Sequence, residues 1–142
     1  MMDKRTARRG WVEEDSGRAM GDEETTVADL RRDLAAFMDE RDWRQFHTPS
    51  NLSHAIAIEA AELMEQFLWL SEEEERALLE DDARRGALVD ELADVLVYSL
   101  TLADVLEIDV SAAVRDKMAR NERRFPASTW RGRARDDVME GG

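Results

Sequence analysis

The feature that most constrains the fold of this chain is the spacing of its apolar residues, which recur every three or four positions. Val27, Leu30, Leu34 and Phe37 or Met38 follow this spacing. Residues 85–106 repeat it with Leu88, Leu92, Val95, Leu96, Ser99, Leu102, Ala103 and Leu106. A period near 3.6 places such residues on one helical face, whereas a half-buried strand needs a period of two. No segment shows strand alternation, so we predict an all-α bundle of four to five helices, with these residues turned towards the core.

Residues able to cap a helix precede most of the periodic segments. The expected helices cover about 27–38, 51–70, a brief stretch within 71–86, then 85–106 and 110–124. The expected caps are Thr25 or Thr26, Ser50 or Asn51, Ser71, and Asp109 or Ser111. Pro49 is placed before the second helix, because proline is excluded from ordinary interior helical positions. One helical domain is predicted over 25–126, with tails over 1–24 and 127–142.

The charge of the chain restricts its partners. Its 33 acidic and 20 basic residues give a net charge of -13, which disfavours binding to the phosphate backbone of nucleic acids. It has no cysteine, so any metal site must be built mainly from oxygen ligands. No apolar run is long enough for a signal-peptide core or a membrane span. We therefore expect a cytoplasmic protein with no membrane partner.

Two pairs of acids lie within apolar helical segments. Glu59 and Glu62 are three residues apart, as are Glu91 and Asp94, so each pair presents its carboxylates together. If the pairs face one another, any two of these carboxylates at about 5 Å repel each other by on the order of 3 kcal/mol at an effective dielectric near 20. A hard divalent cation, Mg²⁺ or Mn²⁺, would neutralise them. The alternative, that these acids flank the core and point to water, stays open.

A second group lies in the last predicted helix. Lys117, Asn121 and Arg124 follow one another at four and three residues, and so share a face that could hold a polyphosphate. A solvated basic face at a helix C-terminus is the other interpretation.

Four segments, ERDWRQFHTPSNL, IEAAELMEQFLWL, DELADVLVYSL and KMARNERRFP, resemble in order and spacing the MazG-like nucleotide pyrophosphohydrolases, most closely the dCTP pyrophosphatase type. The resemblance covers about 25–126. It implies an all-α enzyme that uses magnesium to hydrolyse a nucleoside triphosphate to the monophosphate and pyrophosphate. It also implies a homo-oligomer, a tetramer built as a dimer of dimers.

The resemblance assigns a role to each candidate residue. The metal ligands fall on Glu59, Glu62, Glu91 and Asp94, the base pocket on Trp43, Trp69 and Tyr98, and the phosphate contacts on Lys117, Asn121 and Arg124. Without the resemblance, each aromatic residue would be read as core. His47 lies near Trp43 and is a candidate for contact with the base, whereas His54 is expected to be structural.

Two positions depart from the family's pattern. Some relatives have an acid before the first metal-binding glutamate, where this chain has Ile58, so Glu62 and Glu65 are the remaining candidates for the general base. A histidine of the nucleotide pocket in dCTP-cleaving relatives falls on Leu34, which leaves base preference open. The expected substrate is dCTP or a modified pyrimidine deoxynucleotide. The alternatives are dUTP, an oxidised nucleotide, phosphoribosyl-ATP, or a helical interaction module without activity.

Overall fold

The computed structural model describes residues 20–134, which form helices and no strand. The helices are α1 (Val27–Glu40), the 3-10 helix η1 (Arg44–Phe46), α2 (Pro49–Glu65), α3 (Glu72–Glu80), α4 (Asp82–Val105), α5 (Val110–Arg124) and α6 (Ala127–Trp130). The predicted all-α fold is confirmed. Residues 127–130, expected within a tail, form α6, whereas residues 1–19 of the other expected tail lie outside the described part.

Three of the predicted helix starts are confirmed by their hydrogen bonds. The Thr26 hydroxyl accepts from the Asp29 N–H at 3.1 Å, and the Asp29 carboxylate accepts from the Thr26 N–H at 2.9 Å. Ser71 forms the same reciprocal pair with Glu74 at the start of α3. Asp109 accepts from the first turn of α5. These caps satisfy N–H groups that have no partner inside their own helix.

The predicted limits of α2 are wrong at both ends. Thr48 caps the helix and Pro49 is its first residue, a position where a missing N–H costs nothing and the fixed φ suits the helix. The helix ends at Glu65 and not near 70. Residues 66–69 turn away instead, and Trp69 has φ 63°, in the left-handed region.

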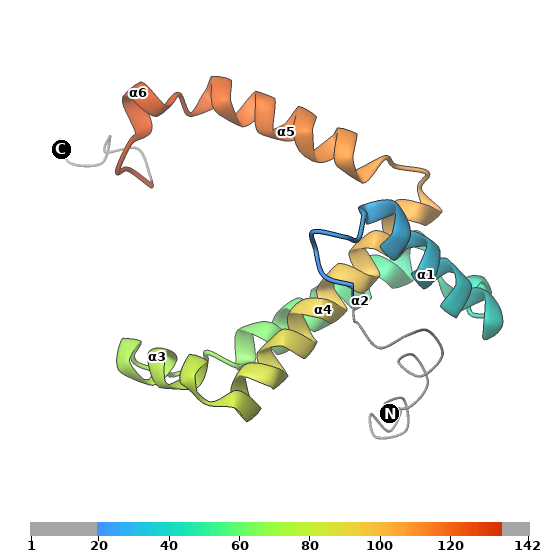
Figure 1. The fold of residues 1–142 in the computed structure, drawn as a ribbon, viewed down its shortest axis with the longest axis horizontal. Coiled ribbons are helices and arrows are strands. Elements are labelled where there is room, and N and C mark those ends of the chain that lie inside the picture. Colours follow the sequence, from blue (N-terminus) through green and yellow to red (C-terminus); the bar gives the residue numbers. More distant parts are fainter. Residues whose placement is uncertain (1–19, 135–142) are drawn as a thin grey trace.

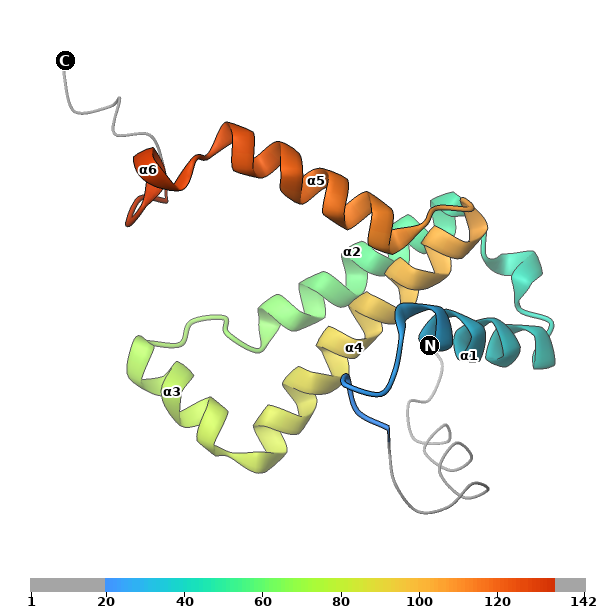
Figure 2. The same ribbon diagram turned by 45° about the horizontal axis from the view of Figure 1, so that its top comes forward.

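The antiparallel pair of α2 and α4 is the centre of the structure (Figure 1). Helix α4 also contacts α1 and α3, and the most buried side chains are Met38, Leu52 and Leu78, one from each of α1, α2 and α3. Helix α5 leaves the end of α4 and extends away from this pair along most of its length (Figure 2). None of the described helices combines the length and apolarity needed to cross a membrane.

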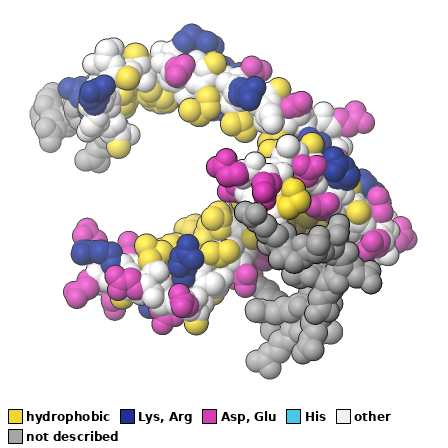
Figure 3. All heavy atoms as spheres, in the orientation of Figure 1, with side chains coloured by type: hydrophobic (Ala, Val, Ile, Leu, Met, Phe, Trp, Pro, Cys, Tyr) yellow, Lys and Arg dark blue, Asp and Glu magenta, His cyan; other side chains and the backbone are white. Residues whose placement is uncertain are grey.

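Much apolar surface is uncovered in the single chain. Leu92 and Leu96, expected to face the core, are 49% and 54% exposed, and Ile58 on α2 is 57% exposed. Apolar side chains gather on the α2–α4 pair and on the side of α5 that faces it (Figure 3). The helical period was identified correctly, but part of this face is left without intrachain packing.

Candidate functional site

Three of the predicted metal ligands converge between α2 and α4. Glu59 and Glu62 lie one turn apart on α2, and the antiparallel neighbour α4 brings Glu91 beside them. One carboxylate oxygen of each lies within 4.8 Å of the others. All three side chains are half-buried, and the Oε2 atoms of Glu59 and Glu91 are buried. Three oxygen donors at this spacing fit a hard divalent cation such as Mg²⁺ or Mn²⁺.

The other two acids of the prediction lie outside this group. Asp94 is half-buried on α4, one turn beyond Glu91, and its role as a fourth ligand stays a prediction. Glu65 is the last residue of α2 and is exposed. The assignment of the general base to Glu62 or Glu65 also stays a prediction.

One end of the α2–α4 pair carries two residues expected at the base. Trp43 precedes η1 and stacks edge-on against Phe37 of α1, with ring centroids 5.6 Å apart at 80°. His47 follows η1, and its Nδ1 is buried without a hydrogen-bond partner. Burial lowers the pKa of the His47 imidazole, and the nearby positive Arg44 lowers it further, so the neutral form is favoured.

A small cavity of about 20 Å³ lies between α1, the η1 region and α4. Its lining includes His47 and Leu34, the two positions that bear on base preference, together with Arg44, Thr101 and Asp104. The last three residues were not among the site residues predicted from the sequence. The only signal was their position in or beside the DWRQFH and α4 segments, since nothing in their spacing indicates that they meet.

Of the other two aromatic residues of the predicted base pocket, Tyr98 is half-buried on α4 and Trp69 lies elsewhere. Trp69 follows the end of α2, whereas Trp43 precedes its start, and a helix of 17 residues spans about 25 Å at 1.5 Å per residue. Trp69 is 91% exposed, and its left-handed backbone is a strained conformation for a bulky residue. One chain therefore does not bring Trp43 and Trp69 together.

The predicted phosphate contacts are also apart from the acids. Lys117 is the middle residue of α5, and Asn121 and Arg124 lie in its C-terminal half. The helix extends away from the α2–α4 pair towards that end (Figures 1 and 2). The Arg124 guanidinium stands over the Phe125 ring at 5.0 Å, and that ring packs edge-on against Trp130. In the described chain, the acids of α2 and α4 and the predicted phosphate contacts of α5 thus lie on separate parts of the structure.

Comparison with known proteins gives concordant matches. A sequence model of the MazG-like family matches residues 54–135. The chain is 43% identical to dCTP pyrophosphatase 1 of Bos taurus over 111 residues, which cover 78% of this chain and 66% of that protein. It is 42% identical to dCTP pyrophosphatase 1 of Homo sapiens over 119 residues, covering 84% of this chain and 70% of that protein. The aligned part thus spans about two thirds of the length of these relatives.

A solved structure also matches. The crystal structure of a pyrophosphatase from Archaeoglobus fulgidus superimposes with a TM-score of 0.66 and is 46% identical in sequence, covering 70% of this chain and 92% of that one. This chain is therefore similar to a pyrophosphatase in both its fold and its sequence.

Proposed function

Since this chain belongs to the MazG-like family, we propose that it is a nucleoside triphosphate pyrophosphohydrolase that depends on a divalent metal. The observation that carries the proposal is the convergence of Glu59, Glu62 and Glu91 in a chain similar to dCTP pyrophosphatases. The proposed substrate is dCTP or a modified pyrimidine deoxynucleoside triphosphate. The products are the monophosphate and pyrophosphate.

In the proposed reaction, water attacks the α-phosphorus and the bond to the oxygen bridging to the β-phosphorus breaks. Bound Mg²⁺ or Mn²⁺ would lower the pKa of a water and neutralise charge on the phosphoryl oxygens. Glu59, Glu62, Glu91 and Asp94 would hold the metal, and Glu62 or Glu65 would accept the proton of the attacking water. The acids would not attack phosphorus themselves.

The remaining assignments concern binding. Lys117, Asn121 and Arg124 would hold the phosphates and the leaving pyrophosphate through charge-assisted hydrogen bonds. The rings of Trp43, Trp69 and Tyr98 would stack on the base, and His47 would contact its edge as a neutral imidazole. Leu34 lines the same cavity as His47, so with an apolar side chain at position 34 the imidazole of His47 would be one of the polar groups of this lining that could recognise the base.

A homo-oligomer, proposed as a tetramer built from two dimers, would complete this site. Ile58, Leu92 and Leu96 expose apolar surface on the same two helices as the acids, and helix–helix burial against another copy would remove it from water. Trp43 and Trp69 lie beyond opposite ends of α2, which is about 25 Å long, and the acids and the predicted phosphate contacts occupy separate parts of one chain. A second copy would supply the missing aromatic ring and the phosphate contacts on α5.

A panel of triphosphates tests the proposal. The purified protein is incubated with dCTP, 5-methyl-dCTP, dUTP, an oxidised nucleotide and phosphoribosyl-ATP, in each case with Mg²⁺, Mn²⁺ or EDTA, and monophosphate and pyrophosphate are quantified. We expect metal-dependent release of both products, fastest from a cytidine nucleotide. Glu62→Gln should abolish release, whereas Glu80→Gln, an exposed acid at the end of α3, should not.

Two outcomes would favour other interpretations. Faster hydrolysis of dUTP or an oxidised nucleotide keeps the reaction and changes the substrate. No monophosphate from any triphosphate with either metal, together with no metal-induced thermal shift, would indicate a helical interaction module. The expected cytoplasmic location and the absence of nucleic-acid binding stay predictions.

A further inference from the structure

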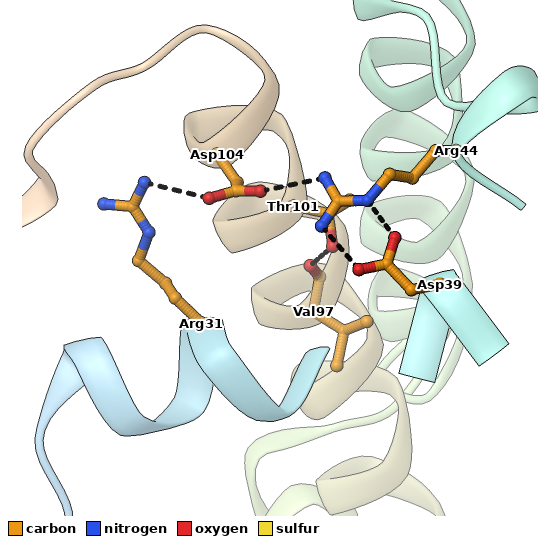
Figure 4. Close-up of polar contacts among 6 residues, drawn as sticks. All are labelled: Arg31, Asp39, Arg44, Val97, Thr101 and Asp104. Carbon is orange, nitrogen blue, oxygen red and sulfur yellow. Dashed lines mark hydrogen bonds and ion pairs between the residues drawn. The ribbon is translucent and has the colours of Figure 1, made fainter. Parts of the chain in front are cut away.

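The carboxylate of Asp104 joins three elements at one end of the α2–α4 pair (Figure 4). Its Oδ1 lies 3.4 Å from Nη2 of Arg31 on α1, and its Oδ2 lies 3.4 Å from Nη1 of Arg44 on η1. The side chain of Asp104 is 36% exposed and that of Arg31 is 23% exposed. This partly buried carboxylate, in the last turn of α4, thus contacts cations 60 and 73 residues away in sequence.

One side of this network holds the segment around η1. Arg44 binds both carboxylate oxygens of Asp39 at the end of α1, with Nη2 to Oδ2 at 3.2 Å, and its third contact is with Asp104. Arg44 directly follows Trp43, and its carbonyl accepts a hydrogen bond from the His47 N–H at 3.1 Å. Fixing the Arg44 guanidinium therefore restricts the backbone on both sides of η1.

The other side holds the connection between α4 and α5. Nη1 of Arg31 donates to the Ile108 carbonyl at 2.8 Å. The Ile108 N–H donates to the Ala103 carbonyl at 2.9 Å, and Glu107 adopts φ 54°, which together end α4 with a left-handed residue. Helix α5 extends away from α2 and α4, so the direction in which it leaves depends on this connection (Figure 2).

We propose that Asp104 is a positioning residue of the nucleotide site. It fixes the position of the η1 segment relative to the start of α5. Through Arg44 it places Trp43 and His47, the proposed contacts of the base. Through Arg31 it positions the start of α5, the helix that carries the proposed phosphate contacts. This inference rests on the proposed function, because it assigns those contacts to one nucleotide. Asp104 itself does not touch the reacting atoms.

Asp104→Asn tests the role, because it keeps the size of the side chain and removes its charge. We expect KM for the preferred triphosphate to rise roughly three- to tenfold, with kcat changed by less than about twofold. Hydrogen exchange should accelerate at the His47 and Ile108 amides together, although they are far apart in sequence. The thermal shift produced by Mg²⁺ alone should be unchanged, since the acids of the metal site are untouched.

Glu40→Gln is the matched control, because it makes the same change in charge in an ion pair between chain neighbours, Glu40 and Arg41, at 3.3 Å. It should alter neither KM nor amide exchange. Asp104→Glu should recover part of the lost affinity. If Asp104→Asn does not fold, Arg31→Gln provides the second variant, and it should accelerate exchange at Ile108 and raise KM.

Failure of this inference can be distinguished from failure of the proposed function. Unchanged exchange at His47 or at Ile108 in Asp104→Asn would overturn the inference, as would an unchanged KM in an active enzyme. A wild-type chain that hydrolyses no triphosphate would refute the proposed function instead. The exchange comparison needs no substrate and would then decide alone whether Asp104 couples the two segments.

Discussion

Replacing Glu62 by glutamine should make the metal-free protein more stable while removing its response to metal. One oxygen of Glu62 lies within 4.8 Å of an oxygen of Glu59 and of Glu91. At that distance two unit charges repel by about 3.5 kcal/mol at an effective dielectric of 20, and by about 0.9 kcal/mol in bulk water. The three side chains are half-buried and partly screened, so we take about 1 kcal/mol for each of the two repulsions that the variant removes.

The expected gain in the free energy of unfolding is therefore about 2 kcal/mol in EDTA at neutral pH, a rise in Tm of roughly 5 °C. Wild-type protein at a Mg²⁺ concentration of about 100 Kd should gain about 2.7 kcal/mol from binding metal in the folded state. Glu62→Gln should lose most of that gain. Thermal melts of both proteins in EDTA and across a Mg²⁺ titration measure the two effects, with Glu80→Gln as the control.

A metal-free Glu62→Gln protein that is less stable than wild type would show that other interactions of the Glu62 side chain outweigh its repulsion by Glu59 and Glu91. An unchanged Mg²⁺ shift would show that Glu62 does not bind the ion. Either result would contradict the reasoning from the convergent carboxylates. A change confined to activity, with both melts unaltered, would do so too.

Three further predictions concern other parts of the structure. Trp69→Gly should raise KM roughly tenfold without lowering Tm, because glycine accepts φ 63°. If sites are shared between subunits, mixing this variant with Trp43→Ala chains should restore some activity, and no recovery after exchange of subunits would argue for single-chain sites. Burial and Arg44 lower the folded pKa of His47, so protonation of this imidazole disfavours folding. The free energy of unfolding should therefore fall as pH drops from about 6.5 towards that lowered pKa. Urea titrations of His47→Gln should show a smaller loss of stability over this range. Hydrogen bonds from Thr26 lower the pKa of Asp29 to about 2. The contribution of Asp29 to the free energy of unfolding is therefore present above its unfolded pKa near 3.8 and is lost as pH falls through about 2. Asp29→Asn should remove that part of the acid transition in urea titrations, and an unaltered transition would contradict this assignment.

The local elements were predictable because their causes are local. Thr26 with Asp29, and Ser71 with Glu74, satisfy helix N–H groups within four residues, so sequence spacing indicated both starts. The same reasoning failed at Pro49, where a residue excluded from a helix interior is favoured at its first position. It also failed after Glu65, because a helical period of apolar residues continues through a segment whose backbone turns at Trp69.

The candidate site was predictable only in part. The pairs Glu59–Glu62 and Glu91–Asp94 follow from the helical period, but their convergence depends on α4 packing antiparallel to α2, which no local pattern specifies. The separation of Trp43 and Trp69, by contrast, follows from the predicted helix over 51–70, because a helix of that length already places the residues before its start and near its end about 30 Å apart. The shorter α2 of the structure still leaves the two residues beyond opposite ends of the helix.

The sequence by itself determined the all-α class, three of the helix caps and the acid pairs on α2 and α4, because backbone hydrogen bonding and side-chain period act over a few residues. The tertiary structure alone decided which acids meet, that Asp104 links Arg31 to Arg44, and that α5 leaves the α2–α4 pair with its apolar side uncovered. These features join residues tens of positions apart. Their relative placement depends on how whole helices pack, and that is settled by the sum of many weak contacts and not by any one motif.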